Sequence, residues 1–153
     1  MFGRHAAAMS GMAHLTCFNG TDTIAAIDLT EKYYSRLVGN SVPATEHSCM
    51  AASINTIQEN SFSGFDRSQS EEQYFKDLIT KIYPDGPVSI VSDTYDFWNV
   101  ITNILPSLKQ EIMNMNGKVI IRPDSGDPVR ILTGDPLSDV VYERQGLIEC
   151  LWN

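Results

Sequence analysis

The sequence predicts an α/β fold in which helices cover parallel strands, and two observations carry this prediction. First, short apolar runs such as VSIV at residues 88–91 are typical of strands buried on both faces. Second, segments with apolar residues at helical spacing separate these runs, and this alternation favours a parallel sheet. The composition, with 42% hydrophobic and 20% charged residues over 153 positions, fits one ordinary globular domain.

The N-terminal part of the chain predicts two helices with a short strand between them. Residues 4–13 are rich in Ala and Met and favour a helix, whereas the apolar run 15–18 favours a strand. A turn follows, in which Thr21 or Asp22 can cap a helix over residues 23–34.

A third helix is expected after a break at Gly39. Ser41 offers its N-cap, and the helix runs through His47 toward Ile54. Residues 56–70 are polar and contain Gly and Ser, which predicts a loop.

The rest of the chain continues the alternation of helices and strands. Ser70 and Gln73 form an S-x-x-Q capping box that opens a helix to Ile82. The further elements expected are a strand at 88–91, a helix at 97–112 with a kink at Pro106, a strand at 118–121, a helical turn at 129–132 and a helix at 140–152.

The charge of the chain argues against large anionic partners. The formal net charge is −8, and Lys and Arg residues are scattered singly, so neither nucleic acid nor an anionic membrane surface is an expected partner. The sequence holds no run of about 18 uncharged apolar residues, so no membrane span is expected. A phosphorylated small molecule is compatible with this charge, because a few Arg side chains and backbone N–H groups suffice to bind a phosphate.

The cysteines indicate a reducing compartment. Cys17, Cys49 and Cys150 are odd in number, far apart and without Cys/His ligand spacing. This pattern predicts three reduced thiols in a cytoplasmic protein without structural zinc. We assign no residue as a metal ligand.

Acidic residues follow each of the three expected strands. Asp22 follows the first, Asp93 follows the second, and Arg122 and Asp124 follow the third. Ligands of parallel α/β folds bind outside the carboxyl ends of the strands, so these side chains are candidates for one site. The alternative is that Asp serves here only as a turn or N-cap residue.

His47 is a candidate nucleophile or acceptor near the start of its expected helix. A helix N-terminus favours the neutral imidazole over the imidazolium. Glu46 is the adjacent residue and cannot share its helical face, so Asp93 is the candidate for an orienting carboxylate. The alternative is an ordinary core or surface histidine.

Several runs of residues together closely resemble the nicotinamide phosphoribosyltransferases. The runs, in order, are GTDT (20–23), KYY (32–34), SVPATEH (41–47), PVSIVSDTYD (87–96), VIIRPDSGDP (119–128) and GLIECLWN (146–153). The resemblance covers essentially the whole chain. It implies a (β/α) barrel-like fold of the type II phosphoribosyltransferases. It also implies a homodimer that joins nicotinamide to 5-phosphoribosyl 1-pyrophosphate in NAD biosynthesis, giving nicotinamide mononucleotide and pyrophosphate.

The same resemblance implies catalytic roles for three residues. His47 corresponds to a histidine that ATP phosphorylates, which stimulates the reaction. Asp93 and Asp124 correspond to acids near this histidine, the ribose hydroxyls and the Mg²⁺ that accompanies pyrophosphate. Their charge favours a transition state with oxocarbenium character.

The resemblance also implies a nicotinamide site. Asp22 corresponds to the acid that accepts a hydrogen bond from the carboxamide N–H₂ and disfavours nicotinate. Ser89 and Arg122 correspond to residues near the carboxamide oxygen, and Ser41 and Val42 line the same region.

Comparison with the family pattern predicts that residues 1–153 are the central part of a larger catalytic domain. The stacking aromatic residue and a phosphate-binding Arg would precede Met1, and a glycine-rich phosphate loop would follow Asn153. Two alternatives remain open: an inactive fragment or decoy that pairs with other subunits, and a nicotinate or quinolinate phosphoribosyltransferase relative. Asp22 argues against the second.

Overall fold

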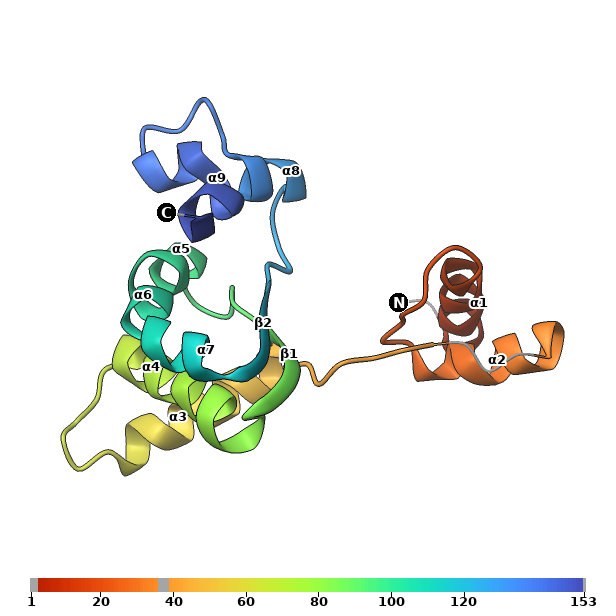
Figure 1. Cartoon of the computed structure of the whole chain (residues 1–153), viewed down its shortest axis with the longest axis horizontal. Coiled ribbons are helices and arrows are strands. Elements are labelled where there is room, and N and C mark those ends of the chain that lie inside the picture. The colour runs from red at the N-terminus through yellow and green to blue at the C-terminus, as the bar shows by residue number, and fades with distance from the viewer. Residues whose placement is uncertain (1–2, 36–38, 153) are drawn as a thin grey trace. The chain divides into compact units, whose positions relative to one another are not determined.

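The computed structural model describes residues 3–35 and 39–152 (Figure 1). The chain divides into two compact units, Met1–Val42 and Pro43–Asn153, and each is described by itself. Within the described residues, no helix has both the length and the apolar character needed to cross a membrane.

The first unit is a pair of helices, α1 (Arg4–Leu15) and α2 (Ile24–Tyr34), that pack closely on each other. A Cβ atom on Gly11 would lie only 2.6 Å from the Cβ of Ala26, so the glycine allows the close approach. Ala26 is fully buried, and its carbonyl oxygen accepts a hydrogen bond from the Thr30 hydroxyl at 2.7 Å. Both expected helices are therefore present.

The strand expected at residues 15–18 is absent, which corrects the prediction. Leu15 is the last residue of α1, and the backbone N–H groups of Cys17 and Phe18 donate to the carbonyl oxygen of His14. A short run of four residues fits a helix end as well as a strand, and its length alone does not distinguish the two.

Residues 41–46 are extended, which corrects the helix expected from Ser41. The N–H of Ser89 donates to the Pro43 carbonyl oxygen at 2.8 Å, and the N–H of Thr45 donates to the Ser89 carbonyl oxygen at 2.9 Å. Ala44 and Ser89 thereby form a parallel bridge. Proline also disfavours a helical conformation for the residue before it. The helix starts only at His47.

Two helices follow in the second unit, α3 (His47–Asn60) and α4 (Arg67–Asp77). The expected loop at 56–70 is therefore much shorter. Asp66 and Gln69 form the capping box of α4 in place of the expected residues. Ser70 donates its hydroxyl to the Asp66 carbonyl oxygen and lies inside the helix. A π-helical turn, η1 (Leu78–Ile82), extends α4.

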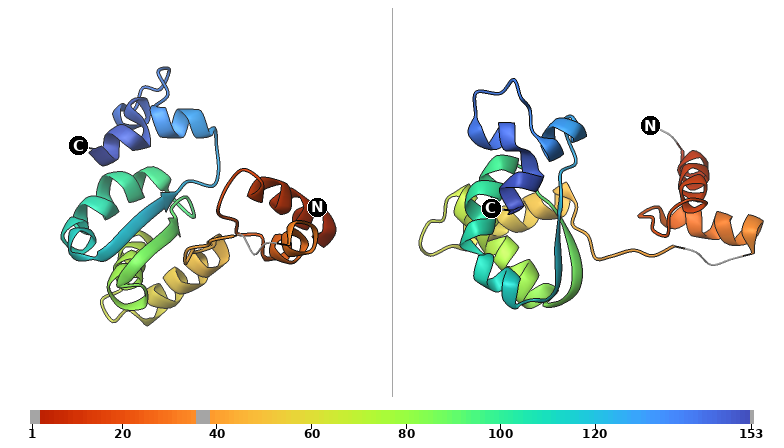
Figure 2. Two further views of the ribbon diagram at one scale, coloured as in Figure 1. Left: turned by 45° about the vertical axis from the view of Figure 1, so that its right-hand side comes forward. Right: turned by 45° about the horizontal axis from the view of Figure 1, so that its top comes forward.

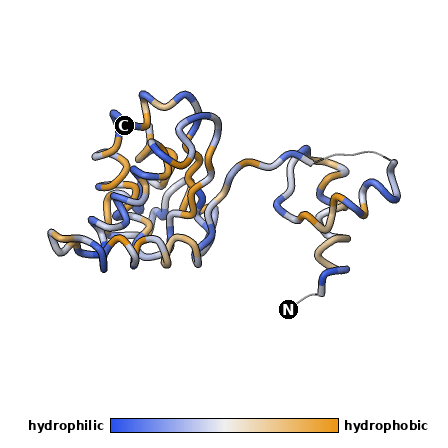
Figure 3. Tube along the Cα trace, turned by 90° about the horizontal axis from the view of Figure 1, so that it is seen from below, coloured by the Kyte–Doolittle hydropathy of each residue, from blue (hydrophilic) through white to orange (hydrophobic). Residues whose placement is uncertain are grey.

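A parallel two-stranded sheet forms the centre of the second unit and confirms both strands expected there. Strand β1 (Asp85–Val91) pairs with β2 (Asn116–Arg122), and Val91 lies opposite Arg122 at their carboxyl ends. The strands lie side by side in each view (Figure 2). Apolar residues of both strands contribute to a core with the helices. Figure 3 shows the hydropathy along the chain, with apolar residues in orange. This architecture confirms a mixed α/β fold.

The helical segment between the strands is made of four pieces. They are α5 (Phe97–Asn99), the π-helical turn η2 (Val100–Ile104), α6 (Leu105–Ser107) and α7 (Lys109–Asn114). The wider π turn ends at Ile104, two residues before Pro106, which has no N–H to donate. The backbone also leaves helical geometry at Leu108, with φ −96° and ψ 9°. The helix is therefore irregular on both sides of Pro106, where the sequence predicts a kink.

Two helices complete the second unit, α8 (Pro128–Thr133) and α9 (Val141–Trp152). Asp127 caps α8 by accepting from the backbone N–H of Val129 at 2.9 Å. The expected C-terminal helix is present, but Gly146, at φ 78°, interrupts it. An alanine there would place its Cβ 2.3 Å from the Gly134 nitrogen, so this position requires glycine.

Candidate functional site

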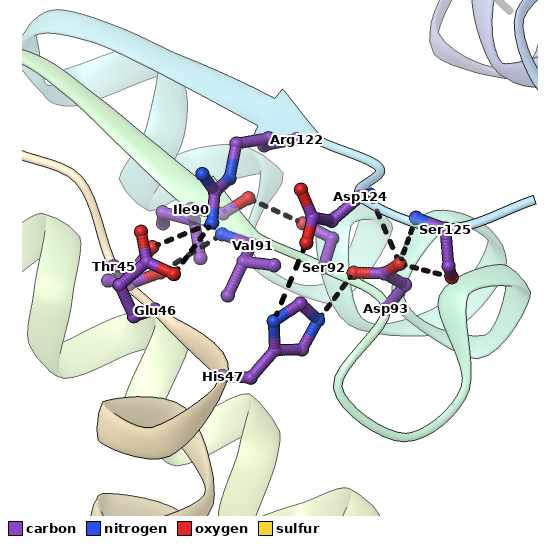
Figure 4. A network of polar contacts seen from close by, with 10 residues as sticks. All are labelled: Thr45, Glu46, His47, Ile90, Val91, Ser92, Asp93, Arg122, Asp124 and Ser125. Atoms are coloured by element: carbon purple, nitrogen blue, oxygen red, sulfur yellow. Dashed lines mark hydrogen bonds and ion pairs between the residues drawn. The ribbon is translucent and has the colours of Figure 1, made fainter. Parts of the chain in front are cut away.

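His47 lies between two carboxylates at the carboxyl ends of the strands (Figure 4). Its Nε2 is 3.1 Å from Asp93 Oδ1, and its Nδ1 is 3.8 Å from Asp124 Oδ2. Asp93 follows β1 and Asp124 follows β2, while His47 is the first residue of α3. The orienting contact expected between His47 and Asp93 is therefore present in the structure.

This geometry selects the tautomer of neutral His47. Asp93 Oδ1 can only accept, so the neutral imidazole carries its proton on Nε2 and donates it there. Nδ1 then keeps a lone pair. The imidazole is 42% exposed, which makes it accessible to solvent and small molecules.

Asp93 is itself firmly held. Its side chain is 7% exposed, and its second oxygen, Oδ2, accepts three hydrogen bonds. These come from the N–H of Asp124 at 3.1 Å, the N–H of Ser125 at 2.8 Å and the hydroxyl of Ser125 at 2.5 Å. Burial raises the pKa of Asp93, but these hydrogen bonds and the one from His47 outweigh burial and hold the pKa below its usual value. Asp93 is thus a preorganised carboxylate.

Arg122 lies at the end of β2 and is held by the segment that precedes α3 (Figure 4). Its Nη2 donates to the Thr45 carbonyl oxygen at 3.2 Å and lies 3.4 Å from Glu46 Oε2. Its Nε is buried and has no hydrogen-bond partner within residues 3–35 and 39–152. Thr45 is fixed in turn, because its hydroxyl accepts from the Val91 N–H at 2.9 Å.

Ser89 occupies the middle of β1 and is 7% exposed. Its backbone N–H and carbonyl groups are engaged by Pro43 and Thr45, and its register partner on β2 is Ile120. Side chains two apart on a strand share a face, so Ser89 lies on the same sheet face as Arg122. Ile120 is 41% exposed on that face.

Asp22, Ser41 and Val42 lie in the first unit and line one hollow there. The Ser41 hydroxyl donates to Asp22 Oδ1 at 3.3 Å. The hollow has a volume of about 680 Å³ and includes His14 and Asn19 in its wall. A parallel bridge between Gly20 and Asn40 brings together the segments that carry Asp22 and Ser41. The sequence instead predicts a strand end before Asp22 and a helix N-cap at Ser41.

The expected site residues therefore form two groups. His47, Asp93, Asp124, Ser89 and Arg122 belong to the second unit, and Asp22, Ser41 and Val42 belong to the first. Three further residues that carry the geometry were missed: Ser125, Thr45 and Glu46. Ser125 follows Asp124 directly in the loop after β2, and its hydroxyl was the available signal. Thr45 and Glu46 were expected inside a helix, and this expectation concealed their contacts.

No preformed metal cage accompanies these residues. In the part of the chain that the structure describes, no cluster of three or more His, Cys, Asp or Glu side chains could hold a metal ion. Cys17, Cys49 and Cys150 are free thiols.

Comparisons with known proteins identify the family. The model of the nicotinate phosphoribosyltransferase family matches residues 1–153. A nicotinamide phosphoribosyltransferase of Acinetobacter baylyi is 44% identical over 99% of this chain and 29% of its own length. Enzymes of the same name are 35% identical in Xanthomonas campestris, over 82% of this chain, and 35% identical in Mycoplasma pneumoniae, over 75%.

The chain spans 29%, 25% and 20% of the lengths of these three relatives, respectively. The match of the family model to every residue nevertheless settles the relationship. This chain belongs to the nicotinate phosphoribosyltransferase family.

Proposed function

We propose that this chain carries part of the active site of a nicotinamide phosphoribosyltransferase. The reaction joins the ring nitrogen of nicotinamide to C1 of 5-phosphoribosyl 1-pyrophosphate and releases pyrophosphate. One observation supports the proposal above others: His47, Asp93, Asp124 and Ser125 form one network at the carboxyl ends of β1 and β2. Relatives named for this activity match the chain over this region.

His47 is the proposed site of phosphorylation. ATP, when bound, would supply the phosphoryl group. Asp93 occupies Nε2, so Nδ1 is the nitrogen with a lone pair for attack. The Asp93 carboxylate also stabilises the positive charge that develops on the imidazole during attack.

The Mg²⁺ that accompanies pyrophosphate is proposed to lie near Asp124. Its carboxylate is 52% exposed, and Mg²⁺ commonly uses one or two protein carboxylates together with substrate phosphates and water. This donor set fits a metal that arrives with the phosphates. Mg²⁺ would neutralise charge on the leaving group, while Asp93 and Asp124 stabilise positive charge on the ribose ring.

The nicotinamide would be recognised through its carboxamide. Asp22 is the proposed acceptor for the N–H₂ group, with Ser41 and Val42 beside it. Ser89 and Arg122 are the proposed donors to the carboxamide oxygen. They lie on one face of the sheet, which supports a shared role.

The same proposal covers the complete fold, the assembly and the cellular location of the enzyme. We propose a barrel-like (β/α) fold of which residues 1–153 are the central part, a homodimeric enzyme and a cytoplasmic location. The parallel β1–β2 pair and the extended segment beside Ser89 support a continuing parallel sheet.

A chimera tests the proposed function. The matched stretch of the Acinetobacter baylyi relative is replaced by this chain, and formation of nicotinamide mononucleotide is measured with nicotinamide, 5-phosphoribosyl 1-pyrophosphate, ATP and Mg²⁺. We expect the chimera to be active and ATP to stimulate it. The His47→Ala variant should lose the stimulation by ATP. A folded chimera without activity would contradict the proposal and favour an inactive fragment. Preferential use of nicotinate would favour the nicotinate relative, and Asp22→Asn tests that preference directly.

A further inference from the structure

The guanidinium of Arg122 is only partly neutralised by its surroundings. Nη2 contacts a neutral carbonyl oxygen, that of Thr45, and one carboxylate, that of Glu46. The side chain is 25% exposed, and the buried Nε has no partner among the described residues. Arg122 therefore retains donors for a ligand, and Glu46 sets how much positive charge that ligand meets.

Glu46 is placed for this effect by the local backbone. It lies between Thr45, which is hydrogen-bonded to β1, and His47, which begins α3. Its carboxylate consequently points to Arg122 while the imidazole of His47 points to Asp93 (Figure 4). Glu46 and His47 are adjacent in the sequence but contact different parts of the site, namely Arg122 and Asp93, respectively.

An unpaired guanidinium binds a carboxylate better than a carboxamide, because the carboxylate adds charge attraction to the hydrogen bonds. A second carboxylate on the same guanidinium opposes this preference by like-charge repulsion. We propose that Glu46, through its ion pair with Arg122, is a specificity-determining residue that favours a ligand with a neutral carboxamide over one with a carboxylate. This inference rests on the proposed function of the site.

The substitution Glu46→Gln tests the inference, because it removes the charge and keeps the size. Binding of nicotinamide and of nicotinate is measured by calorimetric titration of the chimera described above, with and without the substitution in this chain. The ratio of the Kd for nicotinate to the Kd for nicotinamide should fall about tenfold in the variant. Half of that effect or more should disappear at high salt, since the Glu46 side chain is 63% exposed.

Glu59→Gln is the matched control. It removes the same charge from an exposed position on α3, and its ratio of Kd values should stay within twofold of the unmodified chain. Circular dichroism confirms that each variant is folded.

The outcomes separate the two proposals. Binding of both ligands with an unchanged ratio in Glu46→Gln overturns the role of Glu46 and leaves the proposed function standing. A folded chimera without the substitution that binds neither ligand contradicts the proposed nicotinamide site, and the inference falls with it. An equal change in both Glu variants also overturns it, since the effect would then be net charge alone.

Discussion

At the scale of single residues, the site depends on how one carboxylate is shared. The two oxygens of Asp93 have different partners: Oδ1 faces His47, and Oδ2 accepts from Asp124 and Ser125. The sequence predicts the His47–Asp93 contact, because Asp93 follows an expected strand and the adjacent Glu46 cannot share the helical face of His47. It does not predict the Ser125 hydrogen bonds, which depend on the path of the loop after β2.

Removal of the Ser125 hydroxyl should raise the pKa of Asp93. Ser125→Ala takes away one of the hydrogen bonds that stabilise the ionised carboxylate, so the pKa of Asp93 should rise toward its usual value. Carbon-detected NMR of the Asp93 carboxyl group between roughly pH 2 and 6 measures it. Ser68→Ala, which lies on α4, is the control. An unshifted titration in Ser125→Ala would mean that the hydroxyl does not hold Asp93.

Glu71 should make the stability of the chain depend on pH. It is 1% exposed, and burial together with the charge of Asp96 raises its pKa to about 7, although Arg67 opposes the shift. The folded pKa lies above the unfolded one, so the stabilisation is complete below about pH 4.5 and is lost as the pH rises through about 7.

Glu71→Gln should remove that dependence. Between about pH 5 and 8, the free energy of unfolding should fall by about 2 kcal/mol more in the unmodified chain than in the variant. Urea denaturation across this range provides the measurement, with Glu59→Gln as an exposed control. Parallel curves for the unmodified chain and Glu71→Gln would refute the assignment.

At the scale of elements, the sequence predicts those that bury a continuous or periodic apolar pattern. Strands β1 and β2 follow from their uninterrupted apolar runs. The errors fall where long-range contacts decide the conformation. Segment 41–46 carries helix-start signals, yet its hydrogen bonds to Ser89 hold it extended.

The capping box of α4 gives a prediction at this scale. Asp66→Ala removes the hydrogen bond to the Gln69 N–H and should lower the free energy of unfolding by about 1 kcal/mol. Gln73→Ala should cost less, because its side chain bonds only to Asp77 within the helix. Urea denaturation of both variants compares the costs. A larger cost for Gln73→Ala would favour the box that the sequence alone predicts.

At the scale of the whole molecule, the chain divides into two compact units, Met1–Val42 and Pro43–Asn153. The composition predicts a single domain of ordinary size, but it does not register this division. Every contact of the His47 network lies within residues 43–153. The Asp22–Ser41 hydrogen bond lies within the first unit.

Residues 43–153 should therefore keep the network when expressed alone. The amide signals of His47, Asp93 and Ser125 in a ¹H–¹⁵N spectrum should match those of the full chain. The physical reason is that the sheet, its core and the loop after β2 are all retained. Collapse of these signals to random-coil positions would show that the first unit is needed for folding.

The shared carboxylate of Asp93 also has a mechanical consequence. Its two oxygens belong to one rigid plane, so neither can turn without the other. If a change of charge on the His47 ring turns the Asp93 carboxylate, the hydrogen bonds from Ser125 and from the Asp124 backbone N–H must also stretch. The imidazole at the start of α3 and the loop that leaves β2 are therefore joined through the one carboxylate of Asp93.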